Sequence, residues 1–229
     1  MTGAGVPRQV LDSRPMSDGS QGNRRGRRSR EEILEAAARV MAVRGYAGTS
    51  ISVISSESGL PKSAIYHHFH SKGGLLSAVM ARGLYDFFEA MRAAQADPPA
   101  GGTARERLRW YLEKTAEVFE ERRDFLRLHM LLIMSEEAAD VEVRDIITKV
   151  RADGRAWMNH MLCSAFEAEG AAIAQTVADE LAYFAVAGFD GAFIAFQAEG
   201  ERTVLSQMGL VCDAIVALGE AKVARLRGA

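Results

Sequence analysis

Residues 49–72 constrain this chain more than any other segment, because they combine two short helical patterns with a glycine between them. The segment reads TSISVISSESGLPKSAIYHHFHSK. Its first half places small or apolar side chains at positions i, i+3, i+4 and i+7, on one inward face of a helix: Ile51, Ile54, Ser55 and Ser58. Gly59 then supplies the backbone freedom that a tight turn between two helices needs. The pattern predicts a short helix, a turn and a second short helix.

The second helix, expected at about residues 61–68, has two chemically different faces. Ile65 and Phe69 are four residues apart and can anchor to one core. The opposite face carries a cation, a hydroxyl, a phenol and an imidazole: Lys62, Ser63, Tyr66 and His67. Such groups suit phosphates and the edges of bases. The segment therefore looks like a helix-turn-helix in which the second helix is the recognition helix.

Further landmarks extend this pattern over residues 29–80. They are Ile33, Leu34, Ala36, Ala37, Gly45, Tyr46, Thr49, Ser50, Ile54, Gly59, Leu60, Pro61, Lys62, Ile65, Tyr66, His67, His68, Phe69, Ser71, Lys72, Leu75 and Leu76. With these residues the segment resembles the DNA-binding domain of the tetracycline-repressor (TetR) family of bacterial transcription regulators. Ser55 and Ser58 stand where that family usually has alanine, and both are small enough to fit. Pro61 replaces a common capping serine, and proline is accepted at the first position of a helix.

The resemblance implies which side chains meet DNA. Lys62 is expected to donate hydrogen bonds to guanine O6 and N7. Ser63 and Ala64 would meet base edges or a thymine methyl group, and Tyr66 and His67 the backbone or neighbouring bases. Phosphate contacts that fix the register are expected from Thr49, Ser50, His68 and Lys72.

A further helix is expected to begin near Ser71, whose side chain can cap it. Lys72 at this start would oppose the helix dipole. A phosphate partner therefore explains the lysine better than helix stability does.

Charge is divided between two parts of the chain, although the net charge is only −2. Residues 24–72 hold nine Lys and Arg against four Glu, a net charge of +5, whereas residues 73–229 hold seventeen against twenty-four Asp and Glu, a net charge of −7. An acidic remainder is a poor surface for a polyanion, so DNA contact should be confined to the N-terminal domain.

Residues 1–28 are rich in Gly, Ser, Arg and Gln without apolar periodicity, and are expected to be disordered. The first helix should begin at Ser29, which can form a capping box with Glu32. A basic run just before and at this start, including Arg28 and Arg30, could lie along phosphates or enter a minor groove. The alternative is a solvated tail that only improves solubility.

The rest of the chain also reads as helical, at roughly residues 71–96, 103–121, 123–135, 138–169, 171–198 and 203–227, and no alternation typical of strands occurs. The predicted fold is all-α, with about nine helices. Its domains are a disordered basic N-terminal arm (1–28), a helix-turn-helix DNA-binding domain (29–75) and a ligand-binding and dimerisation domain (76–229).

A nearly uncharged stretch at residues 181–196, broken only by Asp190, predicts a helix that is buried on all sides. It is short for a membrane span and is followed by another largely apolar helix. Two such helices suit a four-helix bundle across a two-fold axis, as the family resemblance implies. The expected interface residues are Gly188, Gly191, Ala195, Met208, Val211 and Ile215. Alternatively, both helices complete a monomeric core.

Bulky apolar and aromatic residues between these two regions could line a ligand cavity. The candidates are Trp110, Phe125, His129, Ile133, Trp157, Met161, Tyr183 and Phe193. Orienting polar groups could come from His129, Asn159, Tyr183 and Gln197. For any single residue core packing is the better explanation, and the expectation of a pocket depends chiefly on the family resemblance.

Other chemistry finds less support. Neither Cys163 nor Cys212 needs a disulfide, which fits a reducing cytoplasm, and no secretory segment or membrane-spanning helix is expected. Two histidine sets remain as metal alternatives: His67 with His70, and His160 with Cys163 and Glu167. No phosphate loop, nucleophile elbow or paired acids appear, so no cofactor, no metal and no catalysis are predicted.

The sequence thus predicts a homodimeric repressor that binds double-stranded palindromic operator DNA and is released by a small apolar or amphipathic effector. One alternative is an all-α ligand-binding or enzymatic bundle that uses its helix-turn-helix for protein contact. Another keeps DNA binding but replaces the small molecule by a protein partner or by nothing.

Overall fold

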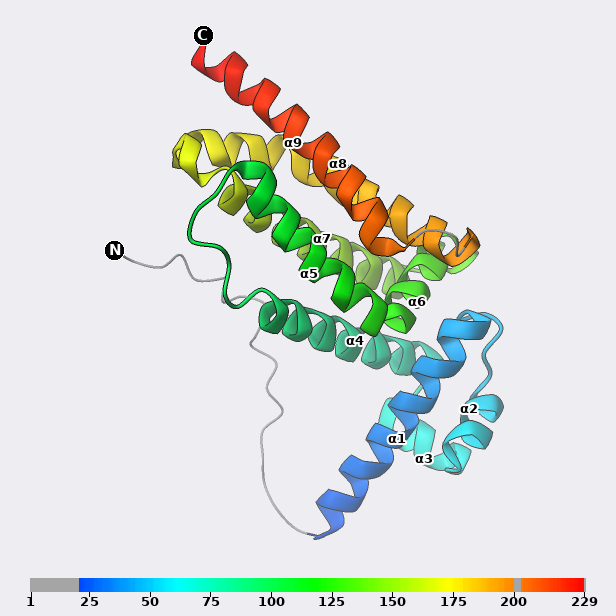
Figure 1. Ribbon diagram of the computed structural model, residues 1–229. Coiled ribbons are helices and arrows are strands. Elements are labelled where there is room, and N and C mark those ends of the chain that lie inside the picture. Colours follow the sequence, from blue (N-terminus) through cyan, green and yellow to red (C-terminus); the bar gives the residue numbers. More distant parts are fainter. Residues whose placement is uncertain (1–20, 200–202, 229) are drawn as a thin grey trace.

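A computed structural model describes residues 21–199 and 203–228, and over these ranges every regular element is helical (Figure 1). The α-helices are α1 (Gln21–Arg44), α2 (Ile51–Ser58), α3 (Lys62–Phe69), α4 (Lys72–Ala94), α5 (Ala104–Glu121), α6 (Arg123–Ile133), α7 (Val141–Ala165), α8 (Ala171–Glu199) and α9 (Val204–Arg227). Two 3₁₀ turns, η2 (Glu136–Ala139) and η3 (Glu167–Glu169), flank α7. The all-α prediction is confirmed.

Helices α1, α2 and α3 form a small unit at one end of the molecule (Figure 1). Ile33 and Met41 of α1, Ile54 of α2, and Ile65 and Phe69 of α3 are all buried in its core. Ser50 caps α2 by accepting a hydrogen bond from the backbone N–H of Val53, and Gly59 ends that helix with φ at 69°. Local capping and turn chemistry therefore produce the two predicted helices.

The start of α1 differs from the prediction. Residues 21–28, expected to be disordered, form the first two turns of α1, so Ser29 lies inside a helix and caps nothing. Arginine is a good helix former, and the Arg28 side chain pairs with Glu32 one turn later at 2.9 Å. The basic run thus extends a helix that projects beyond α2 and α3 (Figure 1). Residues 1–20 of the predicted arm lie outside the described residues.

Helix α4 connects the two ends of the molecule. Ser71 caps it, as predicted, by accepting a hydrogen bond from the backbone N–H of Gly74 at 2.9 Å. Its buried residues pack against α1 and α3 near its start and against α5, α6 and α7 farther along. The predicted domain boundary at residue 75 falls inside this continuous helix, so α4 is a rigid connection between the two regions.

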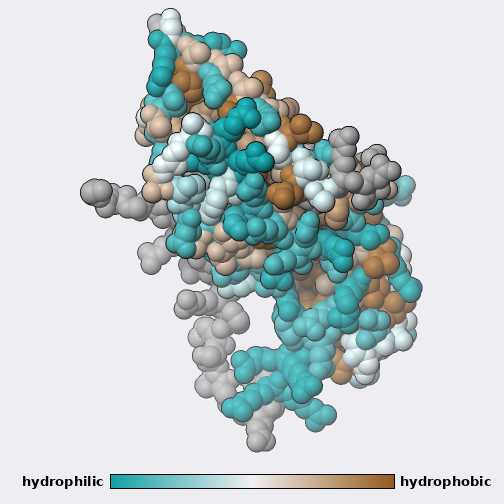
Figure 2. Space-filling model, in the orientation of Figure 1, coloured by the Kyte–Doolittle hydropathy of each residue, from teal (hydrophilic) through white to brown (hydrophobic). Residues whose placement is uncertain are grey.

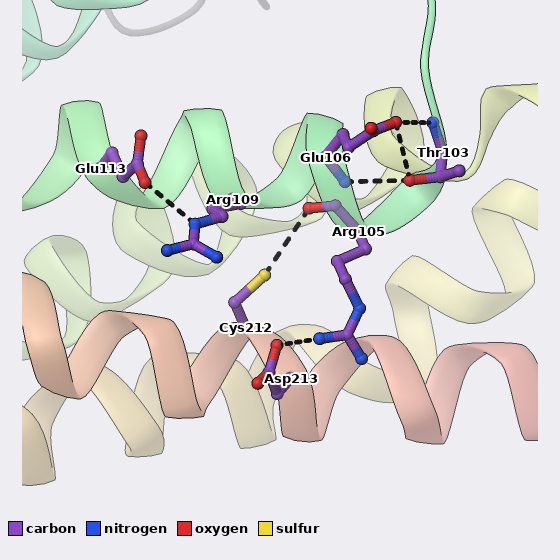
Figure 3. A network of polar contacts seen from close by, with 7 residues as sticks. All are labelled: Thr103, Arg105, Glu106, Arg109, Glu113, Cys212 and Asp213. Carbon is purple, nitrogen blue, oxygen red and sulfur yellow. Dashed lines mark hydrogen bonds and ion pairs between the residues drawn. The ribbon is translucent and has the colours of Figure 1, made fainter.

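The remaining helices form the larger region, in which α5, α7, α8 and α9 lie side by side (Figure 1). A capping box formed by Thr103 and Glu106 starts α5. Figure 3 shows this start facing α9, where Arg105 pairs with Asp213 and the thiol of Cys212 lies 3.8 Å from the Arg105 carbonyl oxygen. Burial raises the pKa of the Cys212 thiol to about 11, so this sulfur is a core group and a poor nucleophile.

Helix α8 is the most apolar element. Residues 171–198 are long and apolar enough to cross a membrane by length and composition, which the sequence analysis did not expect. A third of this stretch is buried, and α8 packs against both α7 and α9. Core helices of soluble proteins meet the same criteria, so this helix is weak evidence for a membrane.

Candidate nucleic-acid interface and ligand cavity

Helix α3 presents a polar outer face, as its sequence predicts. Ile65 and Phe69 are buried, with exposed fractions of 1% and 5%, whereas Lys62, Ser63 and His67 are exposed and Tyr66 is 50% exposed. Ala64 is partly buried at the edge of this face. Pro61 is the N-cap residue rather than the first helical residue, and it provides no side-chain cap. We define the recognition face as Lys62, Ser63, Tyr66 and His67.

One of the expected phosphate contacts cannot form as predicted. Thr49 is 1% exposed, and its hydroxyl donates a 2.7 Å hydrogen bond to the Gly45 carbonyl oxygen. The hydroxyl closes the turn between α1 and α2, which is why it points away from solvent. Ser50 is exposed at the N-cap of α2 and stays a candidate.

Lys72 already has partners within the chain. Its ammonium nitrogen lies 4.2 Å from the centroid of the Tyr46 ring and 3.5 Å from the Ala47 carbonyl oxygen. Partial burial lowers the pKa of Lys72, and nearby Glu137 opposes this shift. Burial also raises the pKa of Tyr46, reinforced by Asp140. A lysine at the start of α4 is thus explained without a phosphate, although its partly exposed ammonium can still meet one.

The arginines of α1 border the recognition helix. The Arg30 guanidinium lies over the Phe69 ring, 5.2 Å from its centroid, next to the partly buried His68. Desolvation lowers the pKa of His68, and His67 and Arg30 lower it further. Arg28, two residues earlier on α1, is exposed. Hydrophilic residues dominate this lower end of the molecule (Figure 2), so the basic segment and the recognition face share one end.

A strained turn joins α3 to α4. His70 has φ at 62°, the only positive φ of a non-glycine residue among those described. The Ser71 N–H donates to the Phe69 carbonyl oxygen at 2.7 Å, which closes a three-residue γ-turn centred on His70. Sequence reasoning missed this feature, because histidine gives no signal for such a turn.

A cavity of about 100 Å³ lies among α4, α5, α6, α7 and α8. Its walls are mostly aromatic and aliphatic: Leu84, Phe87, Phe88, Met91, Thr115, Phe119, Phe125, Leu126, His129, Met130, Val150, Arg151, Gly154, Trp157, Met158, Met161, Val186, Phe189 and Asp190. Four of the predicted ligand contacts are among them: Phe125, His129, Trp157 and Met161. A cavity thus exists where one was expected.

The other predicted ligand contacts do not line this cavity. Tyr183 is 67% exposed on the outer face of α8, and Phe193, although buried, packs against Phe119 beside the cavity. Trp110 packs edge-on against Tyr111, and Ile133 lies near the end of α6. Large apolar side chains suit a cavity by their size alone. Which of them face inward depends on how each helix is rotated about its own axis.

The predicted orienting groups were also only partly right. Asn159 donates a 2.8 Å hydrogen bond to Asp179 between α7 and α8, and Gln197 is exposed, so neither reaches the cavity. Sequence reasoning missed Arg151 and Asp190, which form an ion pair in the cavity wall. Asp190 did carry a signal, because it is the only charge in the apolar stretch 181–196.

His129 is the most unusual polar group in the wall. It is 3% exposed, neither ring nitrogen has a hydrogen-bond partner, and its ring stacks on Phe125 with 6.5 Å between centroids. Burial, reinforced by the Arg151 charge, lowers the pKa of His129 to about 4. Burial also raises the pKa of Asp190, which the bond to Arg151 opposes. At neutral pH His129 is therefore an uncharged imidazole.

The predicted dimer residues need correction. Met208 and Ile215 are 1% and 0% exposed, so they belong to the core of their own chain. Gly188 faces Val211 of the same chain, where an added Cβ would lie 3.2 Å from a Val211 methyl carbon. Ala195 is partly buried, and only Gly191 has open space above it. Helices α8 and α9 are thus rotated so that most of the residues expected at the interface face the core of their own chain.

A different set of apolar side chains is exposed on the outer faces of α8 and α9. These are Tyr183, Phe184, Ile194, Leu210 and Leu218, each 45% exposed or more. We call them the α8–α9 outer face. Monomeric proteins rarely leave so many large apolar groups together in water.

Among the described residues no three His, Cys, Asp or Glu side chains gather closely enough to hold a metal ion. The sequence offered two histidine-containing sets as alternative metal sites. His160 and Cys163 lie one turn apart on α7, and Cys163 instead contacts Asn159 and Gln175.

An exposed polar recognition helix, preceded by a capped helix and a glycine turn, defines a helix-turn-helix DNA-binding protein. Residues 33–79 match the family model described as "Bacterial regulatory proteins, tetR family". Over these residues the chain is similar to the DNA-binding domain of this family.

Individual relatives show the same similarity. The chain is 51% identical over 41 residues to the HTH-type transcriptional regulator LmrA of Bacillus subtilis, covering 18% of this chain and 22% of LmrA. It is 31% identical over 127 residues to the uncharacterised HTH-type transcriptional regulator YxaF of the same species, covering 53% and 63%. The chain thus spans less than two thirds of either curated relative.

The fold is shared along most of the chain. A protein from Saccharomonospora viridis, described as a transcriptional regulator and solved in complex with choline, superimposes with a TM-score of 0.66 at 23% identity. The match covers 83% of this chain and 96% of that one. At this identity the similarity establishes the helical architecture of both regions and nothing about ligands.

Proposed function

We propose that this chain is a ligand-responsive transcriptional regulator in the cytoplasm, not an enzyme, which represses by occupying a palindromic operator as a homodimer. The observation that carries the proposal is the single helix α4, which holds the recognition helix at one end and lines a ligand-sized cavity along its length. A small molecule in the cavity can therefore act on the DNA-binding end without contacting it.

On DNA, the recognition face would enter the major groove. Lys62 is suited to guanine, Ser63 and Ala64 to base edges or a thymine methyl, and Tyr66 and His67 to neighbouring bases and backbone. Phosphates would be met by Ser50, His68, Lys72, Arg28 and Arg30, all exposed or partly exposed at the same end. Thr49 is left out because its hydroxyl is buried and bonded.

The homodimer would form through the α8–α9 outer face. Its exposed Tyr183, Phe184, Ile194, Leu210 and Leu218 lie on two adjacent helices, so a two-fold axis would produce a four-helix bundle. Gly191, which has open space above it, allows a close approach there. Two recognition helices would then reach successive major grooves of one operator.

Coupling between cavity and DNA would pass through α4 and α6. Phe125 lines the cavity and packs on Gly83 of α4 so tightly that a side chain at Gly83 would collide with its ring. The preceding residue of α4, Arg82, pairs with Glu31 of α1 at 2.5 Å. A ligand that moves Phe125 would therefore shift α4 against α1. Reversing occupancy from 99:1 to 1:99 requires a difference of about 5.5 kcal/mol in ligand affinity between the two states.

A monomer-producing variant tests this arrangement. Leu210→Glu places a charge on the α8–α9 outer face and should yield a monomer by analytical ultracentrifugation, with operator affinity reduced at least tenfold, or about 1.4 kcal/mol. Val43→Glu, at another exposed apolar side chain (68% exposed), is the matched control and should stay dimeric. A wild-type chain that sediments as a monomer and binds no DNA contradicts the proposal.

A further inference from the structure

The cavity contains a polar side chain that has no partner in the protein. His129 is 3% exposed, and both Nδ1 and Nε2 lack a hydrogen bond. An uncharged imidazole offers one N–H donor and one lone pair. A buried polar group without a partner is destabilising, and most buried side-chain polar atoms in folded proteins are paired. The cavity thus has an unfilled hydrogen-bonding position at one point of its wall.

The charged groups in the same wall neutralise each other. Arg151 and Asp190 form an ion pair, with side chains 22% and 24% exposed. An anionic ligand would have to compete with Asp190 for Arg151, and a cationic ligand would meet the Arg151 charge beside His129. Protonation of His129 cannot easily compensate an anion, because its pKa of about 4 leaves the neutral form in roughly thousandfold excess at pH 7. The wall therefore suits a ligand without net charge.

The other polar groups near the cavity are already satisfied. The Trp157 indole N–H donates to Gln95 Oε1 at 3.0 Å, and the Gln95 amide nitrogen lies 3.2 Å from both the Tyr111 carbonyl oxygen and Thr115 Oγ1. The Thr115 hydroxyl itself donates to the Tyr111 carbonyl oxygen at 2.8 Å. A ligand consequently needs one hydrogen-bonding group, placed at His129.

Size and lining determine the rest of the ligand. A dry apolar cavity of about 150 Å³ accommodates benzene, so the 100 Å³ present here is close to the volume that one six-membered ring needs. Aromatic rings supply much of the wall, which favours offset or edge-on contact with another ring. Four methionines in the wall have flexible side chains that can yield to small substituents: Met91, Met130, Met158 and Met161.

We propose that this cavity binds an uncharged single-ring phenol, whose hydroxyl forms a hydrogen bond with His129. A phenolic hydroxyl can donate or accept, so it suits either nitrogen of the imidazole, and with a pKa of about 10 it is uncharged at neutral pH. The inference depends on the proposed function for its biological role, but not for binding itself.

Titration calorimetry on the full chain without DNA tests the ligand class directly. The probes are 4-methylphenol, toluene, benzoate and choline. They compare an uncharged phenol with the same ring lacking a hydroxyl, with an anion and with a cation. 4-Methylphenol should bind at least about tenfold more tightly than toluene, since toluene leaves His129 without a partner. Equal binding of the two, tighter binding of benzoate or choline, or no binding of any probe overturns the inference.

Two histidine variants then locate the hydroxyl. His129→Leu should reduce 4-methylphenol affinity about tenfold while leaving toluene affinity unchanged, so that the preference disappears. His160→Leu is the control, because His160 is a partly buried histidine of α7 beside Trp157 but does not line the cavity. It should keep the preference. A His129→Leu protein that retains the wild-type preference would overturn the assignment of the hydroxyl to His129.

The wild-type comparison of probes needs no variant, so a folding defect in His129→Leu would not remove the test. Operator binding measured in parallel separates this inference from the proposed function. A chain that binds 4-methylphenol without any change in operator affinity supports the ligand class and contradicts ligand control of DNA binding. A chain that binds an operator specifically but none of the probes overturns the ligand class and leaves DNA binding supported.

Discussion

The recognition face and the cavity wall place polar side chains in opposite environments. Lys62, Tyr66 and His67 are exposed on a short helix, where water satisfies them until a partner replaces it. His129 is buried and the Arg151–Asp190 pair is partly buried in a largely aromatic wall, where a polar group without a partner lowers stability. Alanine substitutions on the recognition face should therefore change DNA binding with little effect on stability, whereas substitutions in the cavity should change stability and ligand binding together.

Acid offers the largest expected effect on the cavity. The pKa of His129 is about 4 in the folded chain, against about 6.5 when unfolded. Between these pH values the unfolded state binds more protons than the folded state. The contribution of neutral His129 to the free energy of unfolding is therefore intact above pH 6.5 and is lost as pH falls toward 4. It amounts to about 3 kcal/mol. Urea unfolding of wild type and His129→Leu from pH 7 to pH 4 should show that difference, and parallel pH profiles would contradict a buried neutral His129.

Breaking the cavity ion pair should have an effect of similar or slightly smaller size. Arg151→Met leaves the Asp190 carboxylate without its partner and should lower the free energy of unfolding by about 2–3 kcal/mol. The double variant Arg151→Met with Asp190→Leu should recover most of this loss, since it removes both charges. A loss below about 1 kcal/mol for the single variant would show that the pair behaves like one on the surface.

On the recognition face we expect substitutions to change DNA binding and not stability. Lys62→Ala should weaken specific operator binding by about 1–3 kcal/mol and relax the base preference at one position, with no measurable change in stability. Lys114→Ala, in the larger region, is the control and should leave operator binding unchanged. Fluorescence anisotropy with the operator and with single-base variants of it measures both. Unaltered discrimination in Lys62→Ala would remove this residue from base readout.

The smallest expected effect on stability concerns the γ-turn between α3 and α4. His70→Gly should raise the free energy of unfolding by about 0.5–1 kcal/mol, because glycine accepts the positive φ that histidine adopts with strain. His67→Gly, within the regular part of α3, should instead lower it by about 1 kcal/mol. Thermal unfolding distinguishes the two, and destabilisation by His70→Gly would show that the turn is not strained.

Much of the fold could be predicted because its signals are local. The cap at Ser71 and the turn at Gly59 depend on a few adjacent residues, so spacing alone predicts them. The recognition face followed from Ile65 and Phe69 for the same reason. The first turns of α1 give no such signal, because their low apolar content is typical of disordered segments.

The cavity and the interface could be predicted less well. Arg151 and Asp190 are 39 residues apart, and only the packing of α7 against α8 brings them together. Met208 and Tyr183 have apolar character that suits either the core or a subunit interface. Which role each takes depends on the rotation of its helix against a neighbour, and that rotation is set by tertiary packing. Tyr183, predicted to contact the ligand, is therefore exposed, and Met208, predicted at the subunit interface, is buried in the core of its own chain.

Selection of bound duplexes from a random DNA pool by the full-length wild-type chain tests the central claim most directly. We expect enrichment of a palindrome whose half-sites are centred about one helical turn, or a multiple of it, apart. We also expect Lys62→Ala to broaden one position in each half-site. Retention of no sequence above the pool at low ionic strength would contradict a DNA-reading dimer, and so would retention of single, unpaired half-sites.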